Sequence, residues 1–162
     1  MSTKRIEELT PVGFWRRSFA SLIDSFILTL ITYPAFLWVY GRLYFVDPEL
    51  VTVGGFESFM DYGFPLLFVV LFWIWRSATP GKLLLDMEIV DARTGGKPSL
   101  AQWLIRYVGY FVAVLPLGLG ILWVAWDKKK QGWHDKMAKT LVVERDPFEG
   151  LNDELEGLLA RQ

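Results

Sequence analysis

The sequence has no cysteine and a single histidine among its 162 residues. The absence of cysteine excludes disulfide bonds, zinc–thiolate sites, iron–sulfur clusters and catalysis by a thiol. One histidine leaves a zinc site short of nitrogen ligands, so we expect no metal and no other cofactor. The net charge is −1. No excess of basic residues therefore indicates binding to nucleic acid.

Apolar side chains are abundant instead. Hydrophobic residues make up 52% of the chain and aromatic residues 16%, whereas charged residues make up only 22%. An ordinary soluble domain is less apolar, and a disordered chain needs low hydrophobicity and high net charge. The composition predicts an integral membrane protein, with the lipid bilayer as its first partner.

Two apolar segments in the first half of the chain predict full membrane spans. The segment 18–40 is interrupted by one charge, Asp24, and at about 1.5 Å per residue it is long enough for a hydrocarbon core of about 30 Å. The segment 62–75 is shorter and reaches span length only when it is extended back to Phe56.

The third apolar segment, 107–126, contains residues at which a membrane helix can break: Pro116, Gly118 and Gly120. Broken helices are tolerated in membranes where other protein packs around them. We expect a helix over 99–115 and a second over 121–126 that returns, which together make a re-entrant hairpin. The alternative is a third span that is kinked at the proline.

The distribution of lysine and arginine predicts the orientation. Basic residues concentrate in 1–17, 76–106 and 127–145, whereas the loop 41–61 is mainly acidic. The positive-inside rule places both termini in the cytoplasm and this loop outside. A third full span would export the lysines of 128–130, so the rule also favours the re-entrant hairpin.

Two short segments outside the spans have β character. Residues 85–91 alternate between apolar and polar side chains, and 140–144 is rich in β-branched residues. We expect the two to pair, since a lone strand in water is marginal. The predicted fold is an all-α membrane protein, a helical transmembrane bundle with a small cytoplasmic β-hairpin-like element. It comprises a membrane domain over 1–145 and an acidic tail over 146–162.

Asp24 is the polar residue that the membrane singles out. A carboxylate near the centre of a spanning helix costs roughly 2.5–3.5 kcal/mol, so it should face protein or water and have a partner. Arg17 lies two turns earlier on the same face, about 10.5 Å away along the axis, and Arg106 is the other basic candidate. Asp24 therefore forms either a buried contact that fixes helix packing or a cation or proton site.

Asp135 has a structural interpretation. Gly132 permits a sharp turn after the basic run, and His134 and Asp135 open a short helical turn in which a carboxylate can accept backbone N–H bonds. Arg17, at the same membrane surface, can pair with Asp135 and tie the first helix to the last. The block 79–82 (Thr-Pro-Gly-Lys) is interpreted as a turn and not as a phosphate loop, because it lacks the required glycine spacing.

Three sequence blocks resemble the RDD family of bacterial membrane proteins: 13–24 (GFWRR with Ala20 and Ile23-Asp24), 79–91 and 131–143. The likeness runs from about residue 11 to 144. The family is named for one arginine and two aspartates, which the resemblance assigns to Arg17, Asp24 and Asp135, with Asp127 as the alternative for the second aspartate. The resemblance implies transport, including sodium/proton antiport in some members.

The leading hypothesis is a multi-pass protein of the bacterial inner membrane that takes part in ion or solute transport as an oligomer. The expected partners are the bilayer, further copies of the chain or another membrane protein, and a monovalent cation or proton. The candidate ion-binding or transport residues are Arg17, Asp24, Asp135, Asp127 and Arg106. The alternative is a non-transporting scaffold or accessory subunit. An enzyme is not expected, because no nucleophile–histidine–acid spacing is evident.

Overall fold

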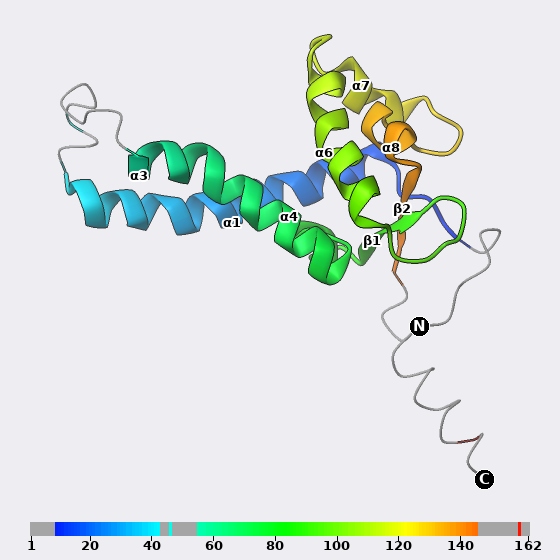
Figure 1. The fold of residues 1–162 in the computed structure, drawn as a ribbon, viewed down its shortest axis with the longest axis horizontal. Helices are drawn as coiled ribbons and strands as arrows, with labels where there is room; N and C mark the ends of the chain where they lie inside the picture. Colours follow the sequence, from blue (N-terminus) through cyan, green and yellow to red (C-terminus); the bar gives the residue numbers. More distant parts are fainter. Residues whose placement is uncertain (1–8, 43–45, 47–54, 146–158, 160–162) are drawn as a thin grey trace.

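The computed structural model of the protein describes residues 9–42, 46, 55–145 and 159. Almost all of the acidic tail predicted over 146–162 lies outside the described residues. Figure 1 shows two parts: a pair of long helices that extend together to one side, and a compact cluster of shorter helices and two strands at the other end.

The two long helices are the predicted spans. Helix α1 runs over Phe14–Tyr40. The second is built from α3 (Gly55–Ser58), the π-helical turn η3 (Phe59–Gly63) and α4 (Phe64–Arg76), which follow one another without a break. Both are long and apolar enough to cross a membrane. The second span begins at Gly55. It therefore includes the extension back to Phe56 that the sequence needed for span length.

The third apolar segment forms a bent pair, as predicted. Helix α6 covers Leu100–Val114, and the chain continues as α7 (Leu119–Leu122) and the 3-10 turn η4 (Trp123–Ala125) at an angle of 112°. The expected helices over 99–115 and 121–126 match these bounds within two residues. In Figure 1, α6 stands steeply across the N-terminal, right-hand part of α1 near the strands instead of running alongside the two long helices. The chain has two spans, or three if the bent pair counts as one.

Local sequence explains both ends of α6. Ser99 caps its N-terminus with a capping box: the Gln102 backbone N–H donates to Ser99 Oγ (3.3 Å), and the Ser99 N–H donates to Gln102 Oε1 (2.9 Å). At the bend, Leu117 and Gly118 have φ values of +55° and +77°. This left-handed conformation ends the helix and suits the glycine.

The two strands pair antiparallel, as expected. Strand β1 (Met87–Asp91) and strand β2 (Thr140–Glu144) place Ile89 opposite Val142. β1 begins two residues later than the alternation predicted, because Asp86 adopts a positive φ of 50°. The segment before α1 adds to the free edge of β2, where the Val12 N–H donates to the Val142 carbonyl (3.0 Å).

The main core lies where the sheet meets the ends of α1, α4 and α6. Its buried members are Val12, Ala20, Trp73, Met87, Ile89, Trp103 and Val142. Trp73 stacks on Trp103 with ring centroids 5.5 Å apart. Two short helices complete this end: α5 (Pro80–Leu84) joins α4 to β1, and α8 (Trp133–Ala138) leads into β2. The predicted site residues lie around this junction.

Candidate functional site

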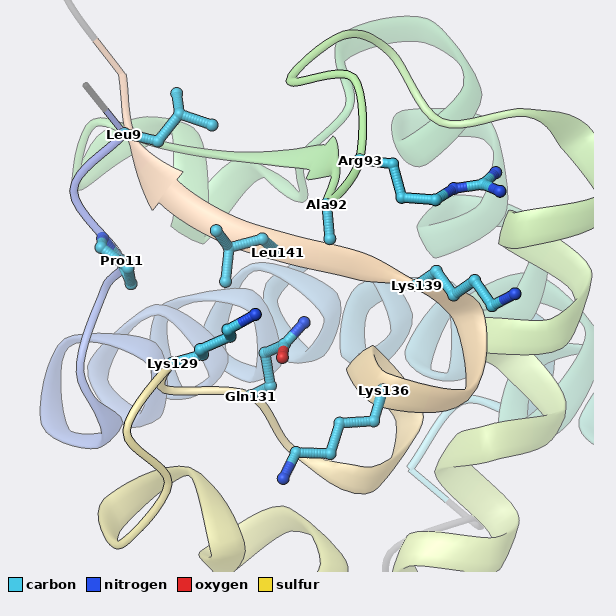
Figure 2. A pocket seen from close by; sticks show the side chains of 9 residues that line it. All are labelled: Leu9, Pro11, Ala92, Arg93, Lys129, Gln131, Lys136, Lys139 and Leu141. Atoms are coloured by element: carbon cyan, nitrogen blue, oxygen red, sulfur yellow. The ribbon is translucent and has the colours of Figure 1, made fainter. Parts of the chain in front are cut away.

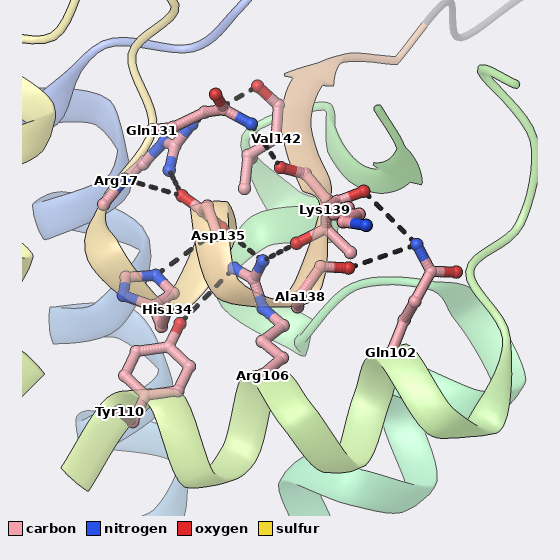
Figure 3. A network of polar contacts seen from close by, with 12 residues as sticks. Arg17, Gln102, Arg106, Tyr110, Gln131, His134, Asp135, Ala138, Lys139 and Val142 are labelled. Carbon is pink, nitrogen blue, oxygen red and sulfur yellow. Dashed lines mark hydrogen bonds and ion pairs between the residues drawn. The ribbon is translucent and has the colours of Figure 1, made fainter. Parts of the chain in front are cut away.

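Asp135 lies at the centre of a buried ionic cluster (Figure 3). Its side chain is completely enclosed. Arg17 Nη1 donates to Asp135 Oδ2 (2.6 Å), and Arg106 Nη1 donates to Oδ1. The Gly132 N–H adds a third donor to Oδ2 (3.1 Å), as expected for a carboxylate in the first turn of α8. The predicted pairing of Arg17 with Asp135 is confirmed.

Each arginine has further partners that bind distant parts of the chain together. Arg17 donates from Nε to the Val12 carbonyl (3.0 Å) and from Nη2 to the Lys130 carbonyl (2.6 Å). Arg106 donates from Nη1 to Thr140 Oγ1 (2.6 Å). The cluster therefore joins α1, α6, α8 and β2 through one carboxylate. With these contacts, Arg17 and Arg106 stabilise the packing of the elements that they join.

Electrostatics match this structural role. Burial by itself raises the pKa of Asp135, but the Arg106 and Arg17 guanidinium groups, His134 and the Gly132 N–H together hold it well below its usual range. The pKa of the neighbouring His134 is also lowered, but here burial is the cause. Burial lowers its pKa to about 3, although the carboxylate of Asp135 attracts a proton to it. The cluster therefore holds a charged aspartate beside a neutral histidine at neutral pH.

Asp24 lies in a different environment. It is half-buried, and its carboxylate accepts hydrogen bonds from Thr79 Oγ1 (2.5 Å) and from the Gly81 N–H (2.7 Å). The expectation that Asp24 would have a basic or hydrogen-bonding partner is confirmed, but the first candidates, Arg17 and Arg106, are not that partner. Both guanidinium groups bind Asp135 instead. The Arg17 side chain extends toward the segment before α1. The donors come from the turn that opens α5.

Gly81 makes this contact possible. A Cβ atom at this position would lie 2.1 Å from the Ala20 carbonyl oxygen and 3.0 Å from Asp24 Cγ. Only a glycine therefore lets α5 lie directly against α1. The turn predicted over 79–82 is thus the element that binds Asp24, a role that its sequence did not indicate.

Lys82, next to this glycine, was not among the predicted site residues. Its side chain is buried, with 6% of the residue exposed, and its ammonium has no hydrogen bond or ion pair with the part of the chain that the structure describes. Burial lowers the pKa of Lys82, and the attraction of Tyr110 and Asp24 only partly opposes this. The resemblance to the second family block contained Lys82, but a lysine after a Pro-Gly turn normally lies on the surface.

Asp127 lies apart from the Asp135 cluster, in the turn after η4. It accepts the Lys129 and Gln131 backbone N–H groups (3.0 and 3.1 Å) and pairs with Lys136 Nζ (2.5 Å). These contacts make it a turn-capping residue. Among the described residues, no group of three or more histidine and acidic side chains is placed to hold a metal ion.

Comparison with known proteins identifies the family. The sequence model of the RDD family matches residues 11–139. The chain belongs to the RDD family. That match covers the Arg17–Asp135 cluster, Asp24 and the α5 turn, and it confirms the resemblance seen in the sequence. No solved structure matches the chain.

The relatives of this RDD protein are bacterial and of similar length. Uncharacterized protein RP437 of Rickettsia prowazekii is 24% identical over 80% of this chain and 94% of its own length. Uncharacterized protein YxaI of Bacillus subtilis is 26% identical over 82% of this chain and 97% of its own length. Uncharacterized protein YckC of the same organism is 28% identical over 86% of this chain and 88% of its own length. The chain is thus an RDD family membrane protein with two or three spans.

Proposed function

We propose that the protein takes part in transport of a monovalent cation or proton across the membrane, with Asp24 as the cation-binding group. The observation that carries this proposal is a half-buried carboxylate on a spanning helix, Asp24, whose charge acts on the buried Lys82, while the Lys82 ammonium has no hydrogen bond or ion pair with the described residues. Intramembrane acids of this kind commonly mark ion pathways. Arg17 and Asp135, in contrast, are held by their own contacts and act as structure.

The chemistry follows from the two groups. Asp24 is held by a hydroxyl and an amide N–H, and no arginine within the described ranges pairs with it. Because burial disfavours the charged form of Lys82, this lysine releases a proton more readily than an exposed one. Loss of that proton leaves the negative charge of Asp24 uncompensated, and a monovalent cation can then take its place. The pair thereby exchanges a cation for a proton.

A transport path requires more than one copy of the chain or another membrane protein. Two spans cannot enclose a polar path, and α1 leaves large apolar side chains such as Phe26, Leu30 and Trp38 exposed over most of its length. An oligomer that packs α1 against a neighbour shields Asp24 from lipid, since a carboxylate exposed to acyl chains is costly.

The test is cation flux in proteoliposomes under an imposed pH gradient. We expect Asp24→Asn to lower flux at least tenfold with unchanged folded yield, since asparagine keeps one acceptor for the Gly81 N–H. Flux of the wild-type protein rises with pH as Lys82 loses its proton, and Lys82→Met removes this pH dependence. Asp127→Asn is the matched control and retains full flux. Absence of flux in the wild type, or full flux in Asp24→Asn, contradicts the proposal.

The second candidate is a non-transporting scaffold or accessory subunit. It is favoured by the Asp135 cluster, in which two family-defining charges are fully occupied in joining helices to strands. In that case Asp24→Asn lowers folded yield or assembly with partner chains, and no ion flux accompanies the wild-type protein. The same variant therefore separates the two candidates.

We also propose that the protein lies in the bacterial inner membrane with both termini cytoplasmic. The distribution of basic residues supports this orientation, and the 112° bend between α6 and α7 is compatible with a re-entrant hairpin. Reporter fusions after Trp38, Trp75 and Arg145 should report outside, inside and inside. An outside signal after Arg145 would restore three full spans.

A further inference from the structure

A basic pocket lies at the edge of the sheet, and neither Asp24 nor the charged residues of the Asp135 cluster line it. It has a volume of about 420 Å³ and is shown in Figure 2. Four cationic side chains from around the start of β2 line it: Arg93, Lys129, Lys136 and Lys139. Apolar residues that include Leu9, Pro11 and Leu141 form another part of the wall, and no acidic side chain is among the described residues that line it. The pocket therefore suits an anion that carries an apolar portion.

Two of the four positive charges are uncompensated. Lys136 pairs with Asp127 (2.5 Å) and Arg93 with Asp91 (3.7 Å). The ammonium groups of Lys129 and Lys139, in contrast, have no hydrogen bond or ion pair within the described ranges. Both residues are exposed. The pocket thus presents a net positive charge to an incoming ligand.

The pocket also lies beside the apolar part of the molecule. Lys136 Nζ is 5.6 Å from the centroid of the Trp123 ring, which belongs to the bent pair. Trp126 is largely exposed and Trp123 is partly exposed, and exposed tryptophans gather at the membrane–water interface. On the other side, Pro11 lies just before the spanning helix α1. The pocket therefore lies beside residues of the kind that contact lipid headgroups.

We propose that this pocket binds the phosphate-bearing headgroup of an anionic phospholipid. Lys129 and Lys139, which lie on opposite sides of the pocket in Figure 2, attract the phosphate by their charge, and the apolar wall accommodates the glycerol and the first methylene groups. Basic pockets beside membrane helices are recognised features for anionic lipids, and ammonium groups hold phosphate as point charges. A zwitterionic headgroup adds a choline cation that these lysines repel, so it binds more weakly.

The test is native mass spectrometry of the full chain in neutral detergent, titrated with phosphatidylglycerol or phosphatidylcholine. We expect wild-type protein to retain one phosphatidylglycerol molecule in preference to phosphatidylcholine. The double variant Lys129→Gln/Lys139→Gln should weaken this binding by about 30-fold, from roughly fivefold for each lysine near an anionic surface. The control Lys97→Gln/Lys128→Gln removes the same charge from residues that do not line the pocket and should leave binding within twofold of wild type.

Further arms of the same experiment can overturn the proposal. An equal loss in the control variant shows that overall surface charge, and not the pocket, attracts the lipid. Displacement of phosphatidylglycerol by 10 mM inorganic phosphate, which is about the concentration at which a weak anion site fills, identifies a free-phosphate site instead of a lipid site. Thermal unfolding of both double variants should match wild type, because all four lysines lie on the surface or in turns.

Discussion

The two carboxylates Asp24 and Asp135 occupy opposite kinds of environment within one small membrane protein. Asp135 is fully enclosed, and two arginines neutralise it. Asp24 is half-buried, and among the described residues it is held by one hydroxyl and one amide N–H. A carboxylate between two guanidinium groups is fixed in its charge state, whereas one bound by neutral donors can gain or lose a counter-cation. On the proposed function, the difference separates a residue that holds the fold from one that is available for exchange.

The contrast extends to how each residue is positioned. Asp135 is set by its place in the first turn of α8 and by arginines from α1 and α6. Asp24 is set by the close approach of α5, which depends on the missing side chain of Gly81. The variants below test whether the first region carries stability and the second does not.

Asp135→Ala should have the largest effect on stability. It leaves Arg17 and Arg106 buried without a counter-charge, and removal of one partner from a buried ionic cluster costs about 3–5 kcal/mol. Chemical denaturation in detergent micelles measures the loss, with Asp127→Ala as a matched control that should cost about 1 kcal/mol or less. If Asp135→Ala is as stable as wild type but inactive, Asp135 belongs to the site and the comparison fails.

Gly81→Ala should come next. Its Cβ would lie 2.1 Å from the Ala20 carbonyl, so α5 must move away from α1. We expect a loss of about 3 kcal/mol, at the upper end of the cost of overpacking. Gly55→Ala, which meets nothing within 4 Å, is the control and should change stability by no more than about 1 kcal/mol. Equal stabilities of the two variants would show that α5 can move away from α1 at little cost in free energy.

The pH dependence of unfolding should reflect His134. Its folded pKa is about 3, and its unfolded pKa is about 6.5, so the unfolded state binds an extra proton between these values. This contribution to stability is complete above pH 6.5 and is lost as the pH falls. At pH 5 we expect the free energy of unfolding to be about 2 kcal/mol lower than at pH 7. His134→Gln should reduce this dependence of the free energy of unfolding on pH. An unchanged dependence would show that other groups cause it.

Asp24→Asn should have the smallest effect on stability. Asparagine keeps an acceptor for the Gly81 N–H and loses a charge that no arginine compensates, so the cost should be about 1 kcal/mol. The same denaturation series measures it against Asp135→Asn. A loss as large as that of Asp135→Asn would make Asp24 a second structural carboxylate and would favour the scaffold over the transporter.

Much of the fold followed from local patterns. The apolar lengths of α1 and of the second span reflect the thickness of a bilayer, and the break between α6 and α7 follows from proline and glycine chemistry around Gly118. The pairing of β1 with β2 followed from the instability of single strands. These features depend on residues close together in the sequence and on the surrounding solvent. They can therefore be predicted from the sequence.

The partners of the charged residues followed only in part. The contact between Arg17 and Asp135 was predicted because both were expected at one membrane surface. The assignment of Arg17 or Arg106 to Asp24 was wrong, since helical spacing places Cα atoms but does not decide where a long side chain extends. Lys82 was missed because its burial depends on α1, α5 and α6 together, and no local signal distinguishes it from a surface lysine.

The sequence by itself determined the membrane class, the spans, the broken third segment and the family, because hydrophobic length, helix breakers and motif order are properties of contiguous residues. Only the tertiary structure decided that Asp135 collects two arginines, that Asp24 binds the α5 turn, and that Lys82 is buried beside it. These contacts join residues far apart along the chain. Their geometry is fixed by packing around Gly81 and the sheet, which depends on many side chains at once.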